Sequence, residues 1–148
     1  VCTGAQMVEG YPRPIHCHVT SGHGTQTFLE ALCNSCNPAF IQLGQKVGAE
    51  KFWEYYQAFG FSEPTGIDLP GEATDIFFSS DGSMTNADLA VASFGQNFSI
   101  TPIQMLTAAA AAVNGGKLVQ PHVVKQILNE QGSIVKKMDP VLVRETVS

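Results

Sequence analysis

Residues 21–40 read S-G-H-G-T-Q-T-F-L-E-A-L-C-N-S-C-N-P-A-F, and this stretch decides the fold. Thr27 and Glu30 have the spacing of a capping box, which predicts a helix that begins just after Thr27. That helix would carry an apolar side made of Phe28, Leu29, Leu32, Cys33 and Cys36. Asn37 and Pro38 then favour a new helix start, because Asn caps helices and Pro suits the first turn. The stretch therefore predicts two helices that meet at residues 35–37.

The chain downstream predicts further helices and then strands. The second helix is expected over residues 37–47 and a third over residues 49–59, whereas Gly and Pro make residues 60–85 irregular. Thr101 and Gln104 form another capping box, so a helix is expected to begin at Pro102. Residues 123–128 and 133–136 flank a polar four-residue loop, which is typical of a β-hairpin. The N-terminal residues 1–19 are expected to be extended. The pattern indicates an α+β fold that is mainly helical.

Composition limits what the chain can bind. The 148 residues include 8 Lys and Arg against 13 Asp and Glu, a net charge of −5. Without a basic stripe, nucleic acid is not an expected partner. The longest candidate for an apolar run, residues 105–113, contains Thr107 and is far shorter than the ~20 residues that span a membrane. Charged residues make up 14% of the chain, below the ~25% of typical soluble domains. We therefore expect a single partial domain over residues 1–148, part of a larger protein.

The four cysteines allow three interpretations. A disulfide between Cys2 and Cys17 would close a loop of about 15 residues and stabilise an extracytoplasmic chain by ~3 kcal/mol. A zinc module with four cysteine ligands would use Cys2, Cys17, Cys33 and Cys36, although the chain has only one C-x-x-C pair. Alternatively, Cys33 and Cys36 are small hydrophobic side chains on a helix face, which is the interpretation that we favour for that pair.

Several motifs in a fixed order resemble the transpeptidase domain of class B penicillin-binding proteins. Residues 21–40 resemble the segment around the S-x-N motif of that family, here Ser35-Cys36-Asn37. Residues 65–72, T-G-I-D-L-P-G-E, resemble its T-G-I-x-L-P-G-E segment. Residues 94–96, F-G-Q, and 101–105, T-P-I-Q-M, resemble its F-G-Q and T-P-x-Q-M run, and the N-G-G at 114–116 follows. The S-C-N variant most resembles the sporulation and division branch of Gram-positive bacteria.

The resemblance implies a fold and an activity. The fold would be the mainly helical portion of the penicillin-binding transpeptidase and serine β-lactamase-like fold, with a C-terminal β-hairpin. The parent protein would be a serine-type D-Ala-D-Ala transpeptidase that cross-links peptidoglycan stem peptides and is acylated by β-lactams. Ser35 would relay a proton, Asn37 would hold the catalytic lysine and the substrate amide, and His23 could line the substrate cleft. No metal or organic cofactor is implied.

The sequence departs from the family pattern at two motifs. K-[ST]-G is absent, and the one S-x-x-K, residues 133–136, follows S-x-N and lies on a predicted strand, where residues three apart face opposite sides. These 148 residues alone are therefore expected to be inactive. The parent would be anchored on the extracytoplasmic face of the cell membrane and would work with other cell-wall synthesis proteins. A non-catalytic scaffold with the same fold is the alternative, and Glu72 is expected to be a structural carboxylate.

Overall fold

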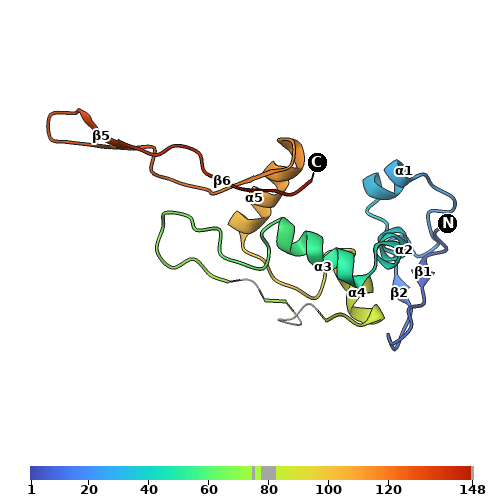
Figure 1. Cartoon of the computed structure of the whole chain (residues 1–148). Helices are drawn as coiled ribbons and strands as arrows, with labels where there is room; N and C mark the ends of the chain where they lie inside the picture. Colours follow the sequence, from blue (N-terminus) through green and yellow to red (C-terminus); the bar gives the residue numbers. More distant parts are fainter. Residues whose placement is uncertain (75, 78–82, 148) are drawn as a thin grey trace. The chain divides into compact units, whose positions relative to one another are not determined.

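The computed structural model describes residues 1–74, 76–77 and 83–147, and these fall into two compact units. The first unit comprises residues 1–53 and 77–98, and the second comprises residues 54–76 and 99–148. Figure 1 draws both units and labels their helices and some of their strands. Helix α3 (Ala49–Ala58) runs from the first unit into the second. The α+β prediction is confirmed, because the described residues contain both helices and small antiparallel sheets.

Helix α1 (Phe28–Cys33) begins at the predicted capping box. The backbone N–H of Glu30 donates to Thr27 Oγ1 at 3.3 Å, and the N–H of Thr27 donates to Glu30 Oε2 at 2.6 Å. The helix ends earlier than expected, at Cys33, and Cys36 lies beyond it. The prediction that Cys33 and Cys36 share one helix face is therefore wrong, since the chain turns at Ser35 between them. Of the predicted apolar side, Phe28, Leu29 and Leu32 are exposed.

Helix α2 (Asn37–Val47) packs against α4 (Asn86–Ala92) and against the short sheet of β1 (Ala5–Gln6) and β2 (Ile15–His16). The buried side chains of this unit come from these elements and the segments beside them: Val8, Ile15, Ile41, Ala90 and Val91, with Phe94 packed against them. Close approach of the two helices requires Gly44, because a methyl group there would collide with the Ser93 side chain at the end of α4. Helix α4 was not predicted, although Thr85 and Asp88 form its capping box.

The second unit is built on α5 (Pro102–Val113), which begins at the predicted capping box of Thr101 and Gln104. Strand β3 (Lys117–Val119) follows and pairs antiparallel with β6 (Leu142–Glu145). Between them, β4 (Gln126–Leu128) and β5 (Ile134–Lys137) form the predicted hairpin, which Figure 1 shows as two strands running side by side. Residues 133–136 thus run into a strand, as predicted. In the described part of residues 60–85, one isolated bridge pairs Ile76 with Ser99.

Within the residues that the structure describes, no helix has both the length and the apolar character needed to cross a membrane.

Candidate active site at the S-x-N turn

Ser35 occupies a left-handed position at the end of α1. Its φ is 46°, and its backbone N–H donates to the Leu32 carbonyl at 3.0 Å, while the N–H of Cys36 donates to the Ala31 carbonyl at 3.1 Å. These two bonds define a Schellman motif, in which the residue at the position of Ser35 is usually glycine. A serine there costs conformational energy, and backbone strain of this kind clusters at functional sites. The turn leaves the Ser35 side chain exposed.

Asn37 begins α2 and faces the neighbouring sheet. We expected Asn37 to cap this helix, but the N-cap residue is Cys36 and Asn37 is the first helical residue. The Asn37 side chain instead donates from Nδ2 to the carbonyl of His16 on β2 at 3.0 Å. Because an asparagine amide can make up to four hydrogen bonds, this bond fixes its orientation without using all of its capacity.

A pocket of about 360 Å³ brings Asn37 together with a second family motif. Its lining includes Asn37, His16 and Arg13, together with Phe94 and Gln96 of the F-G-Q segment. The S-x-N and F-G-Q motifs lie almost sixty residues apart in sequence, yet both reach this one pocket of the first unit. His16 and Gln96 were not among the predicted site residues, because no local sequence signal shows that a strand and a loop converge on a helix start.

The cysteines next to the S-x-N turn are free thiols. Cys2, Cys17 and Cys36 are buried, whereas Cys33 is exposed on α1. The Cys2–Cys17 disulfide is thus not formed in this structure, and Cys33 does not join the other three thiols as the four-cysteine zinc alternative requires. His23 takes that place: its Nδ1 lies 3.4 Å from the Cys17 sulfur. His23 is half-buried and is not among the residues that line the pocket of Asn37.

Burial and hydrogen bonds shift the pKa values of two of these thiols in opposite directions. For Cys2, burial raises the pKa, but hydrogen bonds from the backbone N–H groups of His23 and Gly4 outweigh it and lower the pKa to about 6. For Cys36, burial is the largest effect and raises the pKa of the thiol. A thiolate is therefore favoured first at Cys2.

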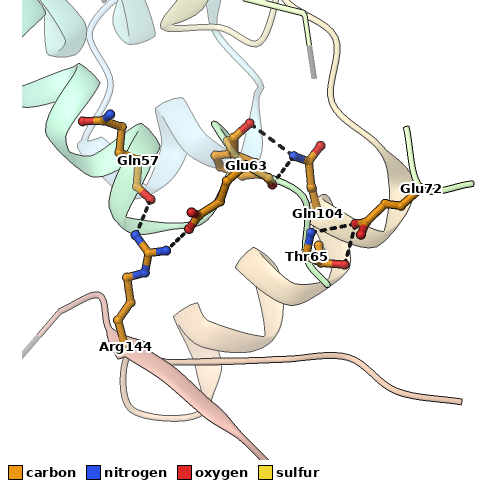
Figure 2. Close-up of polar contacts among 7 residues, drawn as sticks. Gln57, Glu63, Thr65, Glu72, Gln104 and Arg144 are labelled. Carbon is orange, nitrogen blue, oxygen red and sulfur yellow. Dashed lines mark hydrogen bonds and ion pairs between the residues drawn. The ribbon is translucent and has the colours of Figure 1, made fainter. Parts of the chain in front are cut away.

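The T-G-I-D-L-P-G-E segment forms a carboxylate-centred turn in the second unit. Glu72 Oε1 accepts from the Thr65 hydroxyl at 2.6 Å and from the Thr65 N–H at 2.7 Å, and Oε2 accepts from the Gly66 N–H at 3.0 Å. Figure 2 shows Glu72 directed at Thr65. These bonds, led by the Thr65 hydroxyl, lower the pKa of Glu72. Glu72 holds the loop, as predicted, and nothing in its described surroundings points to acid catalysis.

Gln104 of the T-P-I-Q-M segment ties the same loop to α5. Its side chain is buried, and its Nε2 donates to the carbonyls of Glu63 at 2.9 Å and Phe61 at 3.3 Å. Its Oε1 accepts from the Thr101 N–H at 2.8 Å and so completes the helix cap. Figure 2 also shows Arg144, which forms an ion pair with Glu63 and donates to the Gln57 carbonyl at 3.3 Å. Both family segments in this unit thus have structural roles.

Sequence comparison places the chain in a known family. Residues 6–148 match the model of the penicillin binding protein transpeptidase domain. Stage V sporulation protein D of Bacillus subtilis is 42% identical over 135 residues, which are 90% of this chain and 21% of that protein. The peptidoglycan D,D-transpeptidase MrdA of Acinetobacter baumannii is 30% identical over 113 residues, 71% of this chain and 17% of that protein. The chain therefore spans about a fifth of the length of these relatives.

Solved structures have the same fold. The crystal structure of PBPA from Mycobacterium tuberculosis superposes with a TM-score of 0.86 at 24% identity and covers 100% of this chain and 35% of that one. Penicillin binding protein 3 of the same organism, complexed with ampicillin, superposes with a TM-score of 0.82 at 26% identity, over 98% of this chain and 31% of that one. The predicted resemblance, including that to the sporulation branch, is confirmed, and the chain belongs to the penicillin-binding protein transpeptidase family.

Proposed function

We propose that this chain supplies the S-x-N element of a peptidoglycan D,D-transpeptidase, with Ser35 and Asn37 as catalytic residues. The observation that carries the proposal is the local geometry of Ser35 and Asn37. Ser35 is held exposed in a left-handed turn, and two residues later Asn37 reaches a pocket that it shares with the F-G-Q segment. A serine in that position is costly for stability, which favours a role in chemistry.

The reaction is an acyl transfer through a serine ester. The nucleophilic serine, which belongs to the S-x-x-K motif of the parent protein, attacks the carbonyl of the penultimate D-alanine, and the C–N bond to the terminal D-alanine breaks. The lysine of the S-x-x-K motif takes the proton of the nucleophilic serine. Ser35 then passes this proton to the departing amine. The amine of a second stem peptide then attacks the ester, forms the new amide and releases the serine. A β-lactam acylates the same serine in the first step and remains covalently attached to it.

In this scheme, Asn37 positions the lysine and the stem peptide. Its amide, oriented by the bond to the His16 carbonyl, presents its remaining donor and acceptor capacity to the lysine and to the amide of the stem peptide. Because Asn37 is the first residue of α2, its side chain is fixed to a regular element rather than to a loop. Holding the reacting groups in line is worth several kcal/mol of barrier in general.

The test is the rate at which a fluorescent penicillin acylates the complete transpeptidase domain that contains this chain. Ser35→Ala and Asn37→Ala are expected to slow acylation by about 100-fold or more, the usual size of a lost proton relay. Asn34→Ala is the matched control, since Asn34 adjoins the motif but donates to the Gln26 side chain instead, at 3.2 Å. Equal rates in all three variants would contradict the assignment of Ser35 and Asn37.

The alternative is a scaffold that keeps the fold without the chemistry. It would give a folded complete domain that no penicillin acylates, whatever the variant. For the parent protein we further propose attachment to the extracytoplasmic face of the cell membrane, with peptidoglycan stem peptides as substrates and other cell-wall synthesis proteins as partners. Support for this placement comes from the family and from the relatives named as peptidoglycan D,D-transpeptidases.

A further inference from the structure

The side chains of three cysteines and one histidine lie close together at the S-x-N turn. One ligand atom from each of Cys2, Cys17, His23 and Cys36 lies within 4.8 Å of every other. The three cysteines are buried and His23 is half-buried. The four residues come from separate parts of the first unit: the N-terminal bridge, the segment after β2, the turn at residues 22–24, and the start of α2.

The backbone holds these donors in place. The N–H of Cys2 donates to the Gly24 carbonyl at 2.8 Å and the N–H of Gly24 donates back at 2.9 Å, while the N–H of Cys17 donates to the Gly4 carbonyl at 2.9 Å. Gly4 has a φ of 95°, and an added methyl group there would collide with the Thr20 carbonyl. The donors are thus preorganised by main-chain contacts that exist without any bound ligand.

The donor set fits a tetrahedral soft-cation site. Zn–S bonds of about 2.3 Å place the donor atoms of a tetrahedron about 3.8 Å apart, which is within the spread of this cluster. Three cysteines and one histidine are one of the ligand sets used by structural zinc. A single disulfide would use two thiols and leave a buried third thiol beside the imidazole.

We propose that Cys2, Cys17, His23 and Cys36 together bind one zinc-class divalent cation. On binding, any of the three thiols that is still protonated releases its proton to solvent, and each sulfur forms a metal–sulfur bond as a thiolate. The neutral imidazole donates a nitrogen lone pair through Nδ1, the atom that faces Cys17. The bound site carries a net charge of about −1, because three thiolates exceed the two positive charges of the metal. No oxidant or reductant takes part.

This site would act on the S-x-N turn through Cys36. Cys36 stands between Ser35 and Asn37, so a metal at its sulfur ties the left-handed turn to the N-terminal segment and to the turn of His23. Metal binding to the folded state stabilises it by mass action. The metal is therefore a positioning group for Ser35 and Asn37 and has no direct role in acyl transfer. This proposal stands on the thiol cluster and does not depend on the proposed transpeptidase activity.

Metal analysis of the complete domain, purified with a phosphine reductant and without chelators, tests the site directly. We expect about one zinc per protein and, after replacement by Co²⁺, tetrahedral ligand-field absorption with intense thiolate-to-cobalt charge-transfer bands. Folded wild-type protein that gives up zinc to a weak chelator and shows no thiolate-to-cobalt bands would overturn the proposal. So would intact-mass evidence that these thiols pair as a disulfide under the same conditions.

Matched variants locate the ligands. Cys17→Ser and His23→Gln are expected to weaken Co²⁺ binding by more than about 100-fold, whereas Cys33→Ser and His18→Gln keep the wild-type affinity and spectrum. Cys33 is the exposed thiol outside the cluster, and His18 is the exposed imidazole next to Cys17. Circular dichroism distinguishes the loss of a metal ligand from unfolding of the variant. If a variant does not fold, the Co²⁺ absorption spectrum of the wild type decides the case. Unchanged affinity in folded Cys17→Ser and His23→Gln would contradict the site.

Discussion

At the scale of single residues, the most informative position is Ser35, which combines an unfavourable backbone with an exposed hydroxyl. The sequence around it allowed the S-x-N motif to be recognised, but it held no sign of the left-handed conformation. Glycine is the usual signal for such a turn, and none is present at residues 33–37. Similarly, His23 could not be assigned to the thiol cluster, because twelve residues separate it from Cys36 and only the fold brings them together.

Replacing Ser35 by Gly should separate stability from activity. We expect Ser35→Gly to raise the free energy of unfolding by about 1 kcal/mol, because glycine adopts the left-handed conformation without steric cost. It should nevertheless slow penicillin acylation as much as Ser35→Ala does. Asn34→Gly is the control, since Asn34 has a φ of −81° and glycine there should lower stability. Urea unfolding measures the first effect, and a loss of stability in Ser35→Gly would contradict the strained turn.

Glu72 should make the stability of the second unit depend on pH. Hydrogen bonds from Thr65 and Gly66 lower its pKa in the folded state below the unfolded value of about 4.3. Its contribution is therefore complete above that value and is lost as the pH falls through the folded pKa. Melting temperatures at pH 7 and at about pH 3.5 should differ less in Glu72→Gln than in the wild type. Glu130→Gln, in the exposed hairpin loop, should retain the wild-type difference; identical pH profiles in both variants would exclude this role.

At the scale of elements, the helices with strong local signals were predictable and the long-range pairings were not. The capping boxes at Thr27 and Thr101 located α1 and α5, and the polar loop located the β4–β5 hairpin. Helix α4 is short and was missed, although Thr85 and Asp88 carried the same signal. The pairing of β3 with β6 joins strands separated by the whole hairpin, so only tertiary packing determines it.

The contact of α2 with α4 should reverse the usual effect of a helical glycine. In an exposed helix, Gly→Ala raises stability by about 1 kcal/mol. Gly44→Ala should instead lower it by about 2 kcal/mol, because the added methyl group collides with Ser93 in a packed interface. Gln45→Ala, on the exposed side of the same helix, should change little. Chemical denaturation measures both variants, and a stabilised Gly44→Ala would show that the two helices do not pack this closely.

Gln104 should be the most sensitive side chain at the start of α5. Gln104→Ala leaves the Glu63 and Phe61 carbonyls and the Thr101 N–H without this partner, and we expect a loss of about 2 to 3 kcal/mol. Met105→Ala, one residue on and exposed, is the control and should cost far less. Thermal unfolding of the complete domain gives the comparison, and equal losses in the two variants would contradict the account of the T-P-I-Q-M segment.

At the scale of the whole molecule, the first unit contains the S-x-N and F-G-Q motifs, and the second contains the segments whose side chains make structural hydrogen bonds. Ser35, Asn37 and the F-G-Q segment belong to the first unit, and the segments around Glu72 and Gln104 belong to the second. The order of these motifs along the chain was enough to recognise the family, since that order is a property of sequence. Their roles needed the fold, because a hydrogen-bonded carboxylate and a catalytic one look alike in sequence.

Intact mass spectrometry after incubation with penicillin tests the central claim most directly, and it is done on the complete transpeptidase domain and on the 148 residues alone. The complete domain should gain the mass of one penicillin, while the 148 residues, which carry S-x-N without a helical S-x-x-K or a K-[ST]-G, should gain none. An adduct on the 148 residues, or none on a folded complete domain, would contradict the claim that this chain provides the S-x-N element of an acylating transpeptidase.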